Sequence, residues 1–293
     1  MTTVLKFFID ENIQSIESEL VSLVENIQAP VHLKESMLYS LKAGGKRVRP
    51  LYVLAVAKSY GIDLKEALTV GAAVEMIHTY SLIHDDLPCM DDDSLRRGMP
   101  TNHVVYGEAL ATLAGDALNT LAFGVISRID VDPAIRIELI NLLSVAAGAE
   151  GMVGGQILDI EGEKRNLAIE ELENVHVNKT GALLRYSIEA GAVLAGATDE
   201  ERAALVDYGH HIGLAFQIQD DILDITATSE QLGKTAGKDI ISEKSTYPSL
   251  LTLEGAKQKL DEHYEAAILS LQNVSIDTEL LKEFAQYIVK RNK

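Results

Sequence analysis

The chain has 293 residues, of which 47% are hydrophobic and only 5% aromatic, and it contains no tryptophan. Ala, Leu and Ile dominate its apolar positions, which favours an all-α protein over a β-sandwich. The formal net charge of −18 argues against nucleic acid or an anionic membrane as the main partner.

Three further features bear on where the protein works. Cys89 is the single cysteine, so no internal disulfide can form, which fits a reducing compartment and predicts a cytoplasmic protein. Residues 1–12 lack a basic segment followed by a cleavage-type apolar run, so we expect no signal peptide. No stretch approaches the length and purity of a membrane span, so we expect no membrane partner.

Helical spacing of apolar residues recurs along the whole chain. There is no strand longer than a few residues, no linker of disordered composition and no repeat of 20–50 residues, so residues 1–293 are predicted to form a single domain. The predicted helices cover residues 1–28, 31–41, 51–60, 63–86, 107–129, 133–148, 167–194, 201–225, 248–272 and 276–290.

A basic loop, K-A-G-G-K-R-V-R-P, occupies residues 42–50. Lys46, Arg47 and Arg49 are packed into four residues, and Pro50 suits the first position of the next helix. A basic loop at a helix N-terminus makes an anion site, although a solvated basic turn has the same composition. In so acidic a protein, three clustered cations favour a phosphate site.

The stretch L-I-H-D-D-L-P-C-M-D-D-D-S-L-R-R-G, residues 82–98, follows an apolar helix. Its aspartates gather at the C-terminal end of that helix, where they repel one another and the helix dipole opposes them. The alternative is a solvated acidic loop without a functional role. A bound multivalent cation would relieve the repulsion, and hard oxygen ligands suit Mg²⁺. Arg96 and Arg97 follow at once, so the stretch predicts a phosphate bridged to protein through magnesium.

Pro88 disfavours the helical conformation at Leu87 and so ends this helix. The break lets Asp85 and Asp91, which would diverge on a straight helix, turn toward one cavity. His78 lies seven residues before Asp85 and faces the same way. It is therefore either a residue of the site or a core histidine whose hydrogen bonds are made within the protein.

A second aspartate cluster, F-Q-I-Q-D-D-I-L-D, lies in helix 201–225. Asp220 and Asp224 share a helix face, and Asp221 lies to one side of it. Gln217 lies one turn before Asp221, on the side that leads to Asp220. The patch E-G-M-V-G-G-Q-I-L-D at 150–159 is either a tightly packed helix or a break. Residues 232–248 form a Gly- and Lys-rich loop with the composition of a flexible lid.

Together, D-D-L-P-C-M-D, D-D-I-L-D, G-G-K-R-V-R-P, R-R-G and K-T make the chain resemble the short-chain trans-prenyl diphosphate synthases from end to end. Within that family it looks most like the bacterial farnesyl-producing type, whose first motif carries two extra residues, here Pro88 and Cys89.

The resemblance implies an all-α, single-domain isoprenoid synthase fold of about ten or more helices around a deep central cavity, usually as a homodimer. It implies that isopentenyl diphosphate is condensed head-to-tail with dimethylallyl and then geranyl diphosphate to give farnesyl diphosphate. It also implies three Mg²⁺ ions that bridge the allylic diphosphate to the two aspartate clusters. Ionisation leaves an allylic carbocation, which the double bond of isopentenyl diphosphate attacks.

The resemblance also assigns roles to particular residues. The metal ligands would be Asp85, Asp91 and Asp220, supported by Asp86 and Asp224. The allylic diphosphate would be held by Arg96, Lys179 and Lys234, with Lys244 at the lid and Lys238 less well defined. Isopentenyl diphosphate would be held by Lys46, Arg49, His78 and Arg97. Thr180 and Gln217 would lie near the developing cation, and the catalytic set would be Asp85, Asp91, Arg96, Lys179, Thr180, Gln217 and Asp220.

Product length is predicted to depend on Tyr80, with the small Ser81 beside it. Tyr80 lies five residues before Asp85, about 7.5 Å along the helix axis, where the growing tail must run. Its ring can act as a floor that stops elongation after two additions, although ordinary core packing is the alternative.

Four other functions remain as alternatives. A geranylgeranyl diphosphate synthase would share the fold and the motifs. A terpene cyclase usually lacks the second aspartate motif and the basic loop. A His-Asp metal phosphohydrolase could be read from His84-Asp85, but His210 and His211 near the second cluster form no matching pattern. A non-catalytic acidic metal buffer would not need Arg96, Arg97 or the lysines.

Overall fold

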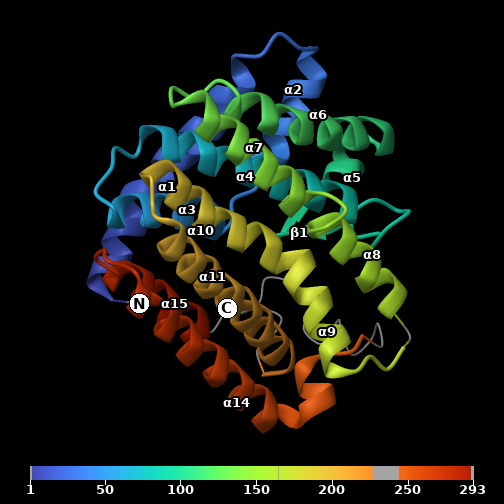
Figure 1. The fold of residues 1–293 in the computed structure, drawn as a ribbon. Helices are drawn as coiled ribbons and strands as arrows, with labels where there is room; N and C mark the ends of the chain where they lie inside the picture. The colour runs from blue at the N-terminus through green and yellow to red at the C-terminus, as the bar shows by residue number, and fades with distance from the viewer. Residues whose placement is uncertain (1, 164, 227–243, 292–293) are drawn as a thin grey trace.

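The computed structural model describes residues 2–163, 165–226 and 244–291, and helices make up most of it (Figure 1). Within these ranges the only strands are the two-residue β1 (Leu95–Arg96) and β2 (Met99–Pro100), which pair antiparallel. The prediction of an all-α fold is confirmed. The helices are α1 (Thr3–Glu25), α2 (Val31–Leu41), α3 (Val48–Ser59), α4 (Lys65–Asp85), α5 (Asn102–Tyr106), α6 (Glu108–Ile126), α7 (Pro133–Ala147), α8 (Met152–Gly162), α9 (Ile169–His176), the π-helical η1 (Val177–Gly181), α10 (Ala182–Ala195), α11 (Asp199–Thr226), α14 (Tyr247–Ser270), the 3₁₀ turn η2 (Leu271–Asn273) and α15 (Glu279–Lys290).

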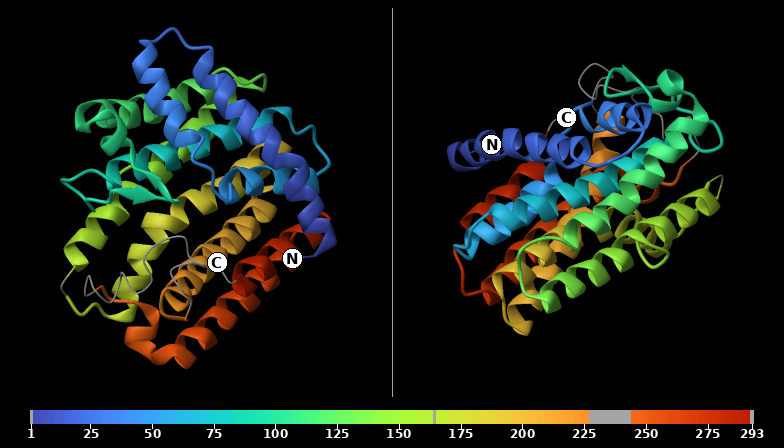
Figure 2. Two further views of the ribbon diagram at one scale, coloured as in Figure 1. Left: turned by 180° about the vertical axis from the view of Figure 1, so that it is seen from behind. Right: turned by 90° about the horizontal axis from the view of Figure 1, so that it is seen from above.

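Helix α4 lies at the centre of the fold. It is buried on almost every side over residues 70–77, and a helix that is apolar all round is typically enclosed by others. It packs against α1, α3, α6 and α10, while α10 packs against α3, α7 and α11. Helix α11 runs along α14, and Figure 2 shows these helices lying side by side. The aspartates at the end of α4 are therefore held by a rigid core element.

Several elements differ from their prediction. Residues 167–194, predicted as one helix, form α9, the π-helical η1 and α10. Helix α3 begins at Val48, so Pro50 is its third residue and not its first. Proline is tolerated there because the first N–H groups of a helix have no intrahelical partner. The glycine-rich patch at 150–159 is mostly helix α8, and Gly155 lies so close to the backbone of Lys179 that a Cβ would overlap it. Of the two alternatives for that patch, the tightly packed helix is correct.

Two helical stretches, Glu108–Ile126 and Pro133–Gly162, are long and apolar enough to cross a membrane. The expectation that no stretch has the length and composition of a membrane span was therefore wrong. Helix α6 nevertheless packs along α4, with Gly115 against the ring of His84, and the second stretch is interrupted between α7 and α8. Because the core helices of soluble proteins can have the same length and apolar composition, these stretches are only weak evidence that the chain crosses a membrane.

Candidate active site

The first aspartate cluster is shaped by the break that follows α4. The backbone N–H of Asp91 donates to the carbonyl of Asp85 at 2.9 Å, so the chain folds back on itself after Pro88. Asp92 completes the reversal with a left-handed φ of 51°. The structure thus brings Asp85 and Asp91 together, as the sequence predicts.

Asp85 carries an unusual charge balance. Burial raises the pKa of Asp85 to about 6, and the nearby Asp91 adds to the increase while Lys179 and Arg96 oppose it. A carboxylate whose ionised form is costly in this way is stabilised by an added cation. Asp85 therefore has the electrostatics expected of a metal ligand.

Asp86 is placed differently from its neighbour. Its buried carboxylate accepts two hydrogen bonds from Arg96 Nε, both at 2.9 Å, and one from Arg96 Nη2 at 2.6 Å. This two-point ion pair joins the end of α4 to β1. Asp86 thus holds Arg96 in place, and the resemblance did not anticipate that these two residues would pair.

The second cluster lies on α11. Asp220 accepts a hydrogen bond from Arg291 Nη2 at 2.6 Å, and Gln217 Nε2 donates to its other oxygen at 3.4 Å. Asp221 turns away and accepts the backbone N–H of Tyr247 at 2.9 Å, so it ties α11 to α14. Asp224 is only 4% exposed, and within the described residues neither of its carboxylate oxygens has a hydrogen-bond partner. A buried, unpaired carboxylate of this kind calls for a cation.

Two lysines converge on one carboxylate that the sequence did not point to. Lys179 on η1 donates to Asp159 Oδ2 at 2.7 Å, and Lys244 donates to the same oxygen at 2.9 Å. Burial favours the neutral acid, but the two ammonium groups outweigh burial and lower the pKa of Asp159. Asp159 thus holds both lysines at one place. Lys234 and Lys238 lie outside the described residues.

A basic pocket of about 450 Å³ brings together side chains from the 42–50 loop, from α4 and from the turn between β1 and β2. Lys46, Arg49, His78 and Arg97 all line it, as the resemblance implies. Burial lowers the pKa of His78 well below its usual value, and Arg49 and Arg97 lower it further, so the imidazole is neutral at pH 7. A neutral imidazole beside three fixed cations can donate one hydrogen bond to an anion.

An apolar pocket, also about 450 Å³, adjoins the first aspartate cluster. Tyr80 and Ser81 of α4 line it, and Asp85, Lys179 and Thr180 lie at its polar end. Further lining residues come from α8 and from the loop after α4, namely Met152, Val153, Gln156, Ile157, Ile160, Cys89 and Met90. Arg49 and His78 line both this pocket and the basic pocket. The two pockets therefore meet at these two side chains.

Sequence reasoning missed two residues of this region, Asp159 and Arg291. Asp159 follows Gly155 by one turn on α8. Gly155 lets the backbone of Lys179 come close to α8, and this glycine was the signal in the sequence that could have pointed to Asp159. Arg291 lies just beyond α15, donates to the carbonyl of Phe216 at 2.8 Å and stacks on the Phe216 ring at 4.0 Å. A terminal K-R-N-K run gives no signal for such a contact.

Comparison with known proteins agrees with this geometry. Residues 30–281 match the polyprenyl synthetase family. The chain belongs to that family. Farnesyl diphosphate synthase from Bacillus subtilis (strain 168) is 52% identical, with all of both chains covered, and that from Geobacillus stearothermophilus is 49% identical over 97% of each. The apo crystal structure of an FPP/GFPP synthase from Zymomonas mobilis superposes with a TM-score of 0.87 at 38% identity, covering 99% of this chain and 100% of that one.

Membership of the polyprenyl synthetase family confirms the predicted enzyme class, a prenyltransferase with the isoprenoid synthase fold. It speaks against the cyclase, the phosphohydrolase and the metal buffer. The structure adds that the Nε2 atom of His84 lies 3.0 Å from the carbonyl of Thr112 and 3.8 Å from Oδ1 of Asp116, both on α6, so that imidazole nitrogen faces α6.

Proposed function

We propose that this polyprenyl synthetase is a magnesium-dependent farnesyl diphosphate synthase. It would join isopentenyl diphosphate to dimethylallyl diphosphate and then to geranyl diphosphate, releasing diphosphate each time. The observation that carries the proposal is the junction of two pockets at Arg49 and His78. One pocket is basic and suits a diphosphate, whereas the other is apolar with carboxylates and lysines at its polar end, which suits an allylic diphosphate.

The carboxylates have the chemistry that magnesium prefers, but among the described residues no three of them are grouped closely enough to hold a metal ion on their own. Asp85, Asp91, Asp220 and Asp224 offer the hard oxygen donors that Mg²⁺ prefers. Asp224 is buried and its carboxylate has no hydrogen-bond partner in the part of the chain that the structure describes; this and the raised pKa of Asp85 both favour a nearby cation. Three bound Mg²⁺ ions would supply positive charge to the departing diphosphate. In this proposal Asp86 supports the site by orienting Arg96.

The chemistry would run from the aspartates toward the junction. Lys179, Lys244 and Arg96 hold the allylic diphosphate, whose C–O bond breaks with both electrons leaving on oxygen. Thr180 and Gln217 direct their oxygen dipoles at the allylic cation that remains. The double bond of isopentenyl diphosphate, held in the basic pocket, forms the new carbon–carbon bond. The proton lost from its C2 passes to the departed diphosphate.

Asp159 would act before this chemistry. Its carboxylate keeps the two lysines together in the substrate-free enzyme. An arriving diphosphate offers more negative charge than one carboxylate and takes over both ammonium groups. The lysines are then already collected where the substrate needs them, which reduces the entropy cost of binding.

Substitution of Arg49 tests the assignment of the basic pocket. The variant Arg49→Ala should raise the KM for isopentenyl diphosphate, because a charge-assisted contact worth about 1.5–3 kcal/mol is lost. That loss corresponds to roughly a ten- to hundred-fold rise in KM. Steady-state kinetics with each substrate varied in turn will measure it. A rise confined to the allylic KM would mean that the two diphosphate sites are interchanged.

One assay tests the function itself. The enzyme is incubated with isopentenyl diphosphate, geranyl diphosphate and Mg²⁺, and the products are identified by chromatography and mass spectrometry. A fifteen-carbon diphosphate is expected, and a twenty-carbon diphosphate would instead identify a geranylgeranyl diphosphate synthase. A cyclic hydrocarbon or free phosphate alone would contradict the proposal.

We further infer that residues 1–293 act as one domain in a cytoplasmic homodimer, with isoprenoid diphosphates and not nucleic acid as partners. Support for the dimer comes from α6, where Leu113 is 56% exposed beside a groove that it shares with Leu33 of α2. Large exposed apolar side chains beside a groove suit a protein interface. Sedimentation equilibrium should give the mass of two chains, and Leu113→Asp should shift it toward one.

A further inference from the structure

Arg47 in the basic loop has an unusual position for a cation. It is 3% exposed, and its Nη1 atom donates to Glu75 Oε1 at 2.8 Å while its Nη2 atom donates to the carbonyl of Leu41. It is the N-cap residue of α3 and has a left-handed φ of 49°, which costs about 1–2 kcal/mol for a residue with a side chain. A strained backbone of this kind persists only where surrounding contacts fix it.

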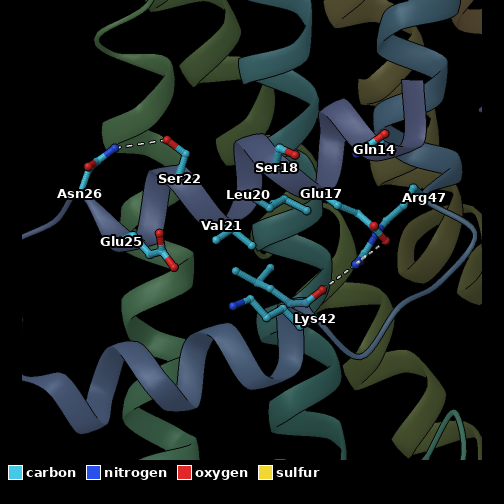
Figure 3. Close-up of a pocket in the computed structure, with 11 residues that line it drawn as sticks. Gln14, Glu17, Ser18, Leu20, Val21, Ser22, Glu25, Asn26, Lys42 and Arg47 are labelled. Atoms are coloured by element: carbon cyan, nitrogen blue, oxygen red, sulfur yellow. Dashed lines mark hydrogen bonds and ion pairs between the residues drawn. The ribbon is translucent and has the colours of Figure 1, made fainter. Parts of the chain in front are cut away.

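Arg47 lines two pockets. One of them, here called the rear pocket, has a volume of about 520 Å³ and is lined by residues of α1 together with Leu41, Lys42 and Arg47. Figure 3 shows Arg47 at one end of this pocket. Arg47 also lines the basic pocket. Glu17 at the mouth of the rear pocket approaches the guanidinium only to 3.9 Å. Arg47 thus lines both the rear pocket and the basic pocket.

Glu75 completes the arrangement. It is 2% exposed and lies on α4 three residues before His78, so the two side chains share a helix face. Among the described residues that line the basic pocket, Glu75 is the one acid. Burial lowers the pKa of Arg49 and of Arg97, and Glu75 opposes the shift at both. One rigid carboxylate therefore influences all three arginines of the pocket.

The loop that Arg47 anchors also positions Arg97. The Nη1 atom of Arg97 donates to the carbonyl of Gly44. Gly45 has a φ of 131°, and a Cβ there would overlap the Arg97 guanidinium. Arg97 thus rests on the loop backbone, and its place depends on where the loop lies.

We propose that Arg47 and Glu75 form a positioning pair for the basic pocket. Their buried ion pair ties the 42–50 loop to α4, so that Lys46, Arg49 and Arg97 are aimed at the same space as His78. The inference rests on the proposed function, because it takes the anion in this pocket to be isopentenyl diphosphate. A role of Glu75 as mere counter-charge makes the opposite prediction, since removing its charge would then tighten anion binding.

The decisive variant removes the pair without changing net charge. In Arg47→Met/Glu75→Leu two apolar side chains of similar size replace the ions, a change that is often neutral for stability. We expect the KM for isopentenyl diphosphate to rise tenfold or more and the allylic KM to stay within twofold. Calorimetry of isopentenyl diphosphate without Mg²⁺ should show the same loss of affinity. An isopentenyl KM within twofold of wild type would overturn the proposal.

If the double variant does not fold, the single variant Glu75→Gln tests the proposal through the same measurement of isopentenyl diphosphate binding. Positioning predicts weaker isopentenyl diphosphate binding in this variant, whereas unchanged or tighter binding overturns the proposal. The matched control is Arg202→Met/Glu189→Leu, which removes a 3.1 Å ion pair between α11 and α10, together with the 2.6 Å pair of Arg202 with Glu138 on α7, and should leave both KM values unchanged. If Arg49→Ala leaves the isopentenyl KM unchanged, the pocket assignment itself has failed. A raised KM in Arg49→Ala but not in the double variant defeats only this inference.

Discussion

Asparagine at position 85 should lower kcat/KM by about a thousandfold or more. The substitution keeps the side-chain shape but removes charge from a proposed metal ligand, and a loss of about 4 kcal/mol in transition-state stabilisation gives that factor. Asp220→Asn should behave in the same way. Steady-state rates at saturating Mg²⁺ measure both variants, with the exposed Asp10→Asn on α1 as control. Near-normal turnover in either variant would remove the residue from the metal site.

The same substitution should leave the metal-free fold no less stable. Because burial raises the pKa of Asp85 to about 6, the folded protein holds this proton more tightly than the unfolded chain does. The stability from Asp85 is therefore complete below pH 4 and lost as the pH rises through about 6. The Asp85→Asn variant has no carboxyl group to ionise at this position and so does not lose this stability as the pH rises. Its free energy of unfolding in urea at pH 7 without Mg²⁺ should therefore be no lower than that of the wild type. Added Mg²⁺ should stabilise the wild type only.

Alanine at position 80 should shift the product from fifteen carbons to twenty or more. Tyr80 is buried, lines the apolar pocket and meets the ring of His84 edge-on at 5.7 Å. Removal of its ring deepens the space available to the growing tail, at a cost of up to about 3 kcal/mol in stability from the void. Mass spectrometry of the dephosphorylated products gives the chain lengths directly.

A phenylalanine at the same position is the matched control for this test. Tyr80→Phe keeps the ring and removes only the hydroxyl, so farnesyl diphosphate should remain the product. If Tyr80→Ala stays active and still stops at fifteen carbons, the floor lies elsewhere. The apolar side chains of α8 that line the same pocket, such as Ile157, would then be the next to truncate.

Local signals in the sequence were enough for most of the fold. Helix α2 was predicted at 31–41 and observed at Val31–Leu41, because Pro30 bounds it on one side and the 42–45 turn on the other. The reversal after Pro88 was predicted because proline restricts the residue before it. The basic residues of one pocket and the carboxylates at the polar end of the other were likewise predicted from short stretches of sequence.

Contacts between distant segments were harder to foresee. Asp159 meets lysines 20 and 85 residues away, and nothing in its neighbours predicts either partner. Arg47 and Arg49 are alike in sequence and both line the basic pocket, yet only Arg47, which has a left-handed backbone, donates a hydrogen bond to Glu75. The pairing of Asp86 with Arg96 depends likewise on the strand turn that follows.

The junction at Arg49 and His78 bears on how one active site can perform two additions in succession. In the proposed reaction, the lengthened product keeps the diphosphate that entered with isopentenyl diphosphate, so this group is still in the basic pocket after bond formation. A second round requires the ten-carbon intermediate to move that group across to the aspartates once the first diphosphate has left. Each extension therefore includes a translocation from one pocket to the other. Processivity then depends on a basic pocket that binds its anion firmly enough to react and loosely enough to pass it on.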